Sequence, residues 1–60
     1  MVPCNFYVRV PDRDGEYRPK PMKAVALRLM QDGDTWKTMV LVLKGSRMEW
    51  FGMDDLLVVE

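Results

Sequence analysis

The sequence predicts an all-β fold built from five antiparallel strands, and three observations carry this prediction. The stretch from Trp36 to Phe51 consists of two β-rich runs separated by Gly45-Ser46, a pair suited to a tight hairpin turn. Residues 4–10 alternate between apolar and polar side chains, as a half-buried strand does. A second turn signal, Asp32-Gly33, separates the hairpin from the apolar run before it.

The first strand is expected at residues 4–10. Phe6, Val8 and Val10 fall on one face of this strand and the intervening residues on the other. Pro11 ends the strand, and the segment PDRDGEYRPKP that begins there is predicted to be one long loop. Its prolines favour an extended, stiffened backbone over a flexible one.

Residues 22–30 fit two interpretations. As a helix, the apolar residues recur at i, i+3, i+4, i+7 and i+8 from Met22, and the composition favours helix. As a strand, Val25, Leu27 and Leu29 share one face, and the turn signal after them favours a hairpin with the next strand. We expect a strand. The alternative is an α+β fold in which residues 22–31 form a helix against an antiparallel sheet.

The strand interpretation also suggests how this run pairs with the strand after it. If Leu27 lies opposite Met39 and Val25 opposite Leu41, all four side chains occupy one face of the sheet. The connecting loop is then Asp32-Gly33-Asp34, a length common in hairpins.

The next two strands, at residues 36–44 and 47–51, form the central hairpin. Gly45 as the first residue of a two-residue loop suits a type II′ turn, because that position requires a positive φ. The turn sets the cross-strand pairs Leu43–Met48, Val42–Glu49, Leu41–Trp50, Val40–Phe51 and Met39–Gly52.

The two faces of this hairpin are both apolar. We expect the face with Met39, Leu41, Leu43, Met48 and Trp50 to be the core. The second face then presents Val40, Val42 and Phe51, which are covered either by closure of a barrel or by a partner.

Residues 52–55 are predicted to form a turn with 3₁₀ character, and residues 56–59 a short last strand. A long loop after the first strand, a three-stranded meander and a 3₁₀ turn before the last strand resemble the SH3-like small β-barrel. This resemblance lies in strand and loop order and covers nearly the whole chain. It implies a single domain, residues 1–60, folded as a five-stranded antiparallel barrel. The aromatic signature of peptide-binding SH3 domains after the first strand is absent, so the resemblance assigns no binding residue.

Composition excludes several classes of function. Cys4 is the only cysteine and histidine is absent, so one copy has neither a disulfide nor the usual zinc ligands. The sequence also lacks a catalytic triad, a Cys-His pair and a complete calcium loop. No apolar run is long enough to span a membrane, and no signal peptide is evident. We therefore expect a cytoplasmic protein that is not an enzyme and needs no cofactor or metal.

Charge is unevenly distributed although the net charge is zero. Nine basic and five acidic residues precede Glu49, which gives that part +4. The remaining charges are all negative: Glu49, Asp54, Asp55 and Glu60. Such polarity can orient a partner, although charges also simply keep a small surface hydrated.

Protein interaction is the function that the sequence favours. The expected protein is a small bacterial or phage-type accessory module that binds a protein partner or associates with itself as a dimer. The expected contacts are Trp36, Val40, Phe51 and Tyr17, because aromatic side chains concentrate binding energy at interfaces. The alternative is a nucleic-acid-binding barrel whose basic loop uses Arg13, Arg18, Lys20 and Lys23, although zero net charge weakens electrostatic attraction to phosphates.

Overall fold

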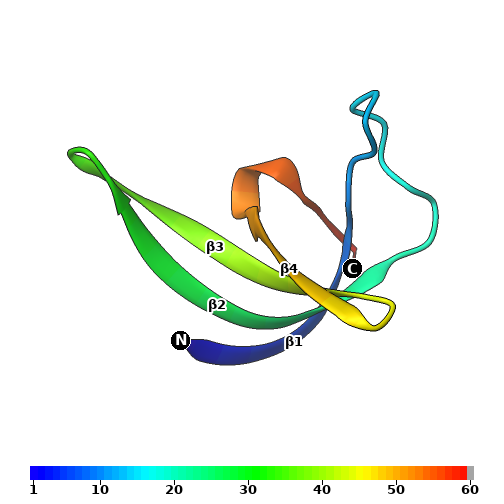
Figure 1. Cartoon of the computed structure of the whole chain (residues 1–60), viewed down its shortest axis with the longest axis horizontal. Helices are drawn as coiled ribbons and strands as arrows, with labels where there is room; N and C mark the ends of the chain where they lie inside the picture. The colour runs from blue at the N-terminus through cyan, green and yellow to red at the C-terminus, as the bar shows by residue number, and fades with distance from the viewer. Residues whose placement is uncertain (60) are drawn as a thin grey trace.

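A computed structural model describes residues 1–59, which form one five-stranded antiparallel sheet (Figure 1). The elements are β1 (Val2–Arg9), β2 (Met22–Asp32), β3 (Thr35–Lys44), β4 (Arg47–Gly52), the 3₁₀ turn η1 (Met53–Asp55) and β5 (Leu57–Val59). The all-β class is therefore confirmed. The helical alternative for residues 22–31 is wrong, because this segment is the longest strand of the sheet.

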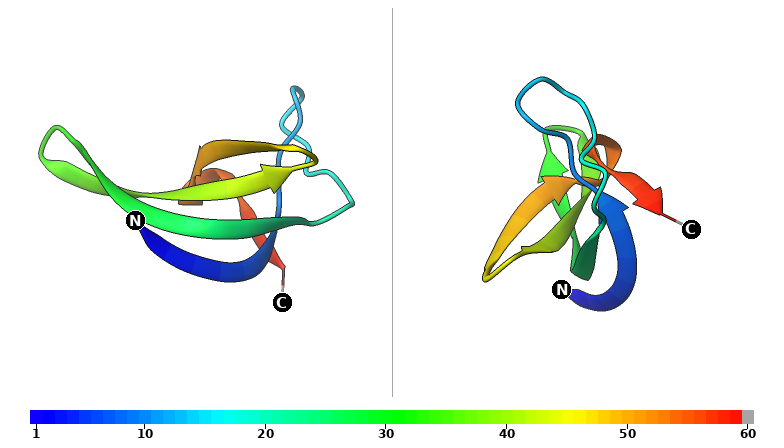
Figure 2. Two further views of the ribbon diagram at one scale, coloured as in Figure 1. Left: turned by 60° about the horizontal axis from the view of Figure 1, so that its bottom comes forward. Right: turned by 90° about the vertical axis from the view of Figure 1, so that its right-hand side faces the viewer.

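The strands lie in the order β4-β3-β2-β1-β5. The sheet is strongly coiled, but its two edge strands β4 and β5 do not pair with each other, so it stays open (Figure 2). The structure thus has the expected strands without the closure of a barrel. An open sheet leaves unpaired backbone groups along its edges.

The central hairpin has the predicted register. All five predicted pairs between β3 and β4 are present, from Leu43–Met48 to Met39–Gly52. Gly45 has a φ of 63°, as the first residue of a type II′ turn requires. The two turn residues Gly45-Ser46 are sufficient to fix which residues of the two strands face each other.

The assignment of the two faces is corrected, because the structure reverses it. Val40 and Val42 are completely buried, and Phe51 packs against the core. Met48, which was expected in the core, is 60% exposed. The inner side of this coiled sheet is narrow, and its fully buried side chains are valines, with Ala24 beside them. Leu41, Leu43, Met48 and Trp50 lie on the outer face, and Phe51 is the large side chain of β4 that packs against the core.

The register between β2 and β3 also differs from the expectation. Leu27 lies opposite Val40 rather than Met39, because a β-bulge between Ala24 and Ala26 shifts the pairing by one residue. The connecting loop is Gly33-Asp34, one residue shorter than expected, since Asp32 pairs with Thr35. The bulge brings Leu27 to the core face, where it packs against the buried cluster.

The long loop between β1 and β2 is organised by Asp12. Its Oδ1 accepts hydrogen bonds from the backbone amides of Asp14 (2.9 Å) and Glu16 (3.1 Å). A bridge between Pro11 and Tyr17 closes the loop at its base. The carboxylate of Asp12 therefore shapes a turn. Cys4 on β1 is partly buried against the core, as expected for a small apolar side chain.

Candidate functional site

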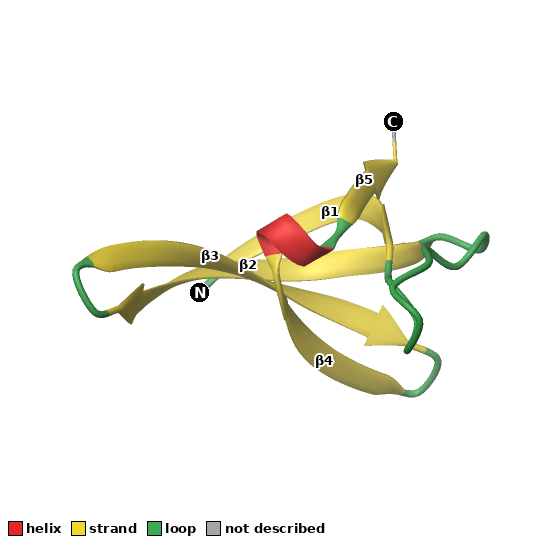
Figure 3. Cartoon of the chain, turned by 90° about the horizontal axis from the view of Figure 1, so that it is seen from above, coloured by secondary structure: helices red, strands yellow, loops and turns green. Residues whose placement is uncertain are grey.

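The loop end of the β2–β3 hairpin extends beyond the rest of the sheet. β1 pairs with β2 only as far as Leu27, and β4 pairs with β3 only from Met39 onward. Residues 28–38 therefore form a two-stranded ribbon without a neighbouring strand in the described part of the chain (Figures 1 and 3). We call this ribbon the arm. Two-stranded ribbons are marginally stable in water on their own.

The core face of the sheet continues along the arm past the point where the core ends. Leu27 lies on that face, and the alternation of side chains places Leu29 and Trp36 there as well. Leu29 lies opposite Thr38 and Trp36 opposite Gln31, so Leu29 and Trp36 are diagonal neighbours within reach of each other. The side chain of Leu29 is 66% exposed and that of Trp36 is 62% exposed. Apolar residues in core positions are thus left in water.

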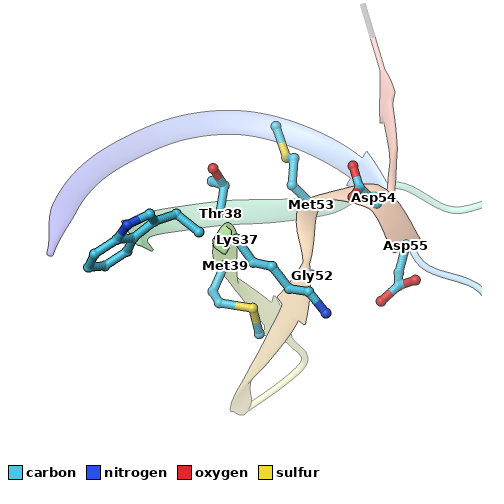
Figure 4. Close-up of a pocket in the computed structure, with 8 residues that line it drawn as sticks. Lys37, Thr38, Met39, Gly52, Met53, Asp54 and Asp55 are labelled. Carbon is cyan, nitrogen blue, oxygen red and sulfur yellow. The ribbon is translucent and has the colours of Figure 1, made fainter. Parts of the chain in front are cut away.

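A groove of about 490 Å³ lies between the β3 strand of the arm and η1 (Figure 4). Thr38, Met53 and Asp54 lie on one side of it, and Lys37, Met39 and Asp55 on the other (Figure 4). The alternation along β3 explains this division, since Thr38 shares the face of Val40 while Lys37 and Met39 share the opposite face. The complete lining is Trp36, Lys37, Thr38, Met39, Gly52, Met53, Asp54 and Asp55.

The charges in the groove are only partly paired. Lys37 Nζ lies 3.0 Å from Asp32 Oδ2, and the hydrogen bond to this carboxylate raises the pKa of Lys37 above its ordinary value. The negative charge of Asp32 adds to the rise, with smaller contributions from Asp54 and Asp55. Within residues 1–59, Asp54 and Asp55 form no ion pair. The wall made by η1 therefore carries two carboxylates that form no ion pair within the described residues.

The groove runs along a free strand edge. Lys44 and Arg47 flank a two-residue turn and so form a hydrogen-bonded pair of β3 and β4. Hydrogen-bonded pairs alternate with non-hydrogen-bonded pairs along an antiparallel ladder, so every second residue of β3 directs its N–H and C=O groups toward β4. The residues of β3 whose backbone groups point to the β4 side are then Val42, Val40, Thr38 and Trp36. β4 ends at Gly52, opposite Met39, so no strand residue within 1–59 lies opposite Trp36 on that side.

The structure does not gather the four predicted contact residues into one patch. Trp36 is exposed in the arm. Tyr17 is exposed too, but it belongs to the long loop at the opposite end of the molecule (Figure 1). Val40 is buried in the core, and Phe51 packs against it partly buried, so neither lies in the arm with Trp36.

The four basic residues of the nucleic-acid alternative are spread over two elements. Arg13, Arg18 and Lys20 are exposed in the long loop, and Lys23 is exposed on β2 opposite Tyr7. The same loop also carries three exposed or half-exposed carboxylates: Asp12, Asp14 and Glu16. Its local charge is therefore close to neutral.

Sequence reasoning missed Leu29, Asp54 and Asp55 as site residues. The alternation along residues 22–30 placed Leu29 on a core face, and only the shorter length of β1 and β4 leaves it uncovered. The clustering of negative charge after Glu49 was a signal for the two aspartates, but their position in the groove that Trp36 also lines depends on the turn at Gly52.

Residues 1–59 contain no group of three or more potential metal ligands. They also contain no helix with the length and apolarity needed to cross a membrane. No known protein family, curated protein or solved structure matches the chain.

Proposed function

We propose that the chain is a non-enzymatic protein-interaction module, of the small accessory kind encoded by bacteria or phages, and that the arm is its contact surface. The strand order and the 3₁₀ turn before β5 support an SH3-like assignment of the sheet, although the sheet is open. The partner is another protein, with a second copy of the chain as the simplest variant.

The observation that carries this proposal is the continuation of the core face into the arm. Leu29 and Trp36 follow Leu27 and Val40 on one face, yet no element of the described chain covers them. Burying such side chains stabilises a protein by roughly 1.5–3 kcal/mol each. A partner that covers the arm therefore buries this apolar surface, and the free energy gained favours binding.

The composition of the arm also fits a contact surface. Trp is among the residues that most often dominate binding energy when an interface buries them. The arm places Trp36 on a ribbon whose backbone is paired with β2 and held at one end by the core, which reduces the ordering that binding requires. By contrast, the near-neutral long loop gives the nucleic-acid alternative no specific support.

Site-specific photo-crosslinking tests the proposal. A benzophenone amino acid replaces Trp36 in one variant and Met48 in the matched control, because Met48 is equally exposed but lies on the outer face. Both variants are expressed in cells of the source organism and irradiated, and the adducts are identified by mass spectrometry.

We expect a discrete protein adduct from position 36 and little or none from position 48. An adduct with a second copy of the chain would identify the partner as the protein itself. Absence of any adduct at position 36, or equal labelling at both positions, would contradict the proposal.

A further inference from the structure

We infer that the free edge of β3 in the arm takes up an extended segment of the partner protein as an additional strand, with a lysine or arginine of that segment beside Asp54 and Asp55. This inference rests on the proposed function, because it specifies what kind of partner segment the arm binds. It concerns the edge of β3, whereas the proposed function concerns the apolar face of the arm.

The backbone of the arm supplies the first part of the argument. The backbone N–H and C=O groups of Trp36 point away from β2 and face the groove. No strand within residues 1–59 pairs with them. No turn or loop hydrogen bond of the described chain uses them either. Unpaired backbone groups on a strand edge are a ready template for a further strand, and many peptide-binding domains use such an edge.

The position of the groove supplies the second part. An added strand antiparallel to β3 continues the line of β4, from which the chain departs at Gly52. The groove of about 490 Å³ occupies this place, within the size range of ordinary ligand sites. Neither this groove nor the second one, at Lys44 to Glu49, is lined by residues of β2 on the other edge of the arm.

The charge of the groove identifies the chemistry of the segment. Lys37 is already engaged by Asp32, whereas Asp54 and Asp55 have no ion pair in residues 1–59. These two carboxylates lie where the added strand passes η1, so a basic side chain there is complementary. In the antiparallel arrangement this basic residue is near the N-terminal end of the segment. Apolar side chains at alternate positions then share the face of Trp36.

Lys37 also argues against a second copy as the added strand. A symmetric antiparallel pairing of two arms through the free groups of Trp36 places Lys37 of each copy opposite Thr35 of the other, so each edge presents a lysine to the other. Lysine on an edge strand is a common device against self-pairing.

A peptide selection against the full chain tests the inference. Displayed decapeptides of random sequence are selected for binding, and hydrogen exchange of the backbone amides of the chain is then measured with the synthetic peptides. Each selected peptide is also made with N-methyl groups at alternate residues, which remove the strand hydrogen bonds while keeping the side chains. Affinities are measured for Asp54→Asn/Asp55→Asn and for the control Asp14→Asn, which changes a carboxylate in the long loop.

We expect selected peptides to carry Lys or Arg near the N-terminal end and apolar residues at alternate positions. They should slow exchange of the Trp36 amide, and N-methylation on one set of alternate residues should abolish binding. The double Asp→Asn variant should weaken binding about tenfold, while Asp14→Asn leaves it unchanged.

Several results would overturn the inference: no selected peptide, peptides without basic residues, or binding that survives both N-methylated forms. If the Trp36 amide becomes more protected from hydrogen exchange as the concentration of the chain rises in the absence of peptide, the edge binds a second copy of the chain. If a partner crosslinks to position 36 while the Trp36 amide of that complex exchanges freely, this inference fails and the proposed function stands. If position 36 yields no crosslink, the proposed function itself has failed.

Discussion

Val40 and Phe51 lie opposite each other on neighbouring strands, and both face the core of the coiled sheet. Val40 is completely buried. An unpaired ammonium group in this position costs several kcal/mol, which is comparable to the whole stability of a chain of this size. We therefore expect Val40→Lys to unfold the protein, as measured by the loss of a cooperative urea transition. Met48→Lys on the outer face should change the free energy of unfolding by only about 0.5 kcal/mol. Cooperative folding of Val40→Lys would show that the core lies on the other face.

Arg28 and Trp50 interact on the outer face across β3. The guanidinium carbon of Arg28 lies 4.6 Å from the centroid of the Trp50 ring. Cation–π pairs of this kind contribute about 0.5–1 kcal/mol at accessible sites. We expect a double-mutant cycle of Arg28→Gln and Trp50→Leu, followed by urea denaturation, to give a coupling energy in this range. Additive effects of the two substitutions would mean that the contact does not stabilise the fold.

Gly45 tests the turn that sets the central hairpin. Its φ of 63° is unfavourable for L-amino acids, and no atom lies within 4 Å of the position that a Cβ would occupy. Gly45→Ala should therefore destabilise the fold by about 1 kcal/mol through backbone strain alone. D-alanine at the same position, introduced by chemical synthesis, should be tolerated or stabilising. Equal destabilisation by both forms of alanine would contradict the positive φ.

Lys37 and Asp32 give the arm a pH-dependent contact. The pKa of Lys37 is raised above its ordinary value of 10.5, first by the hydrogen bond to Asp32 and then by the charge of Asp32. Since the folded state holds this proton more tightly, the contact stabilises the fold at pH values below the ordinary pKa of lysine. Its contribution is lost as the pH rises through the raised value. An NMR titration of the Lys37 side chain should show the raised pKa, and Asp32→Asn should return it toward 10.5. An unchanged pKa in Asp32→Asn would show that the pair does not persist in solution.

Local turn chemistry made much of the fold predictable. Gly45-Ser46 determines the pairing of β3 with β4, and Gly52 to Asp55 was recognised as a turn before the last strand. The alternation over residues 4–10 predicts one face for Phe6, Val8 and Val10, and all three belong to the core or pack against it, although β1 ends at Arg9. In each case the deciding interactions lie within a few residues along the chain.

The inner and outer faces of the sheet could not be predicted from the same patterns. β3 is apolar on both faces, with Val40 and Val42 on one and Leu41 and Leu43 on the other, so alternation alone does not choose between them. The choice depends on the curvature of the sheet, which leaves room for valine on the inside. The bulge beside Ala24 was also invisible, because no glycine or other turn residue marks it.

The candidate site was predictable only at Trp36. Exposure of the arm depends on where β1 and β4 stop pairing, a property of the whole sheet rather than of residues 28–38. The groove further requires η1 to lie beside β3, which brings Asp54 and Asp55 to a strand far from them in sequence.

The most direct test of the account is the effect of Leu29→Thr/Trp36→Thr on folding and on binding of the partner identified by crosslinking. Both side chains are exposed, so the free energy of unfolding in urea should change by no more than about 1 kcal/mol. The dissociation constant for the partner, measured by calorimetry, should rise at least about tenfold, whereas the control Met48→Thr should leave it unchanged. An unaltered dissociation constant, or unfolding of the double variant, would show that the apolar face of the arm is not a binding surface.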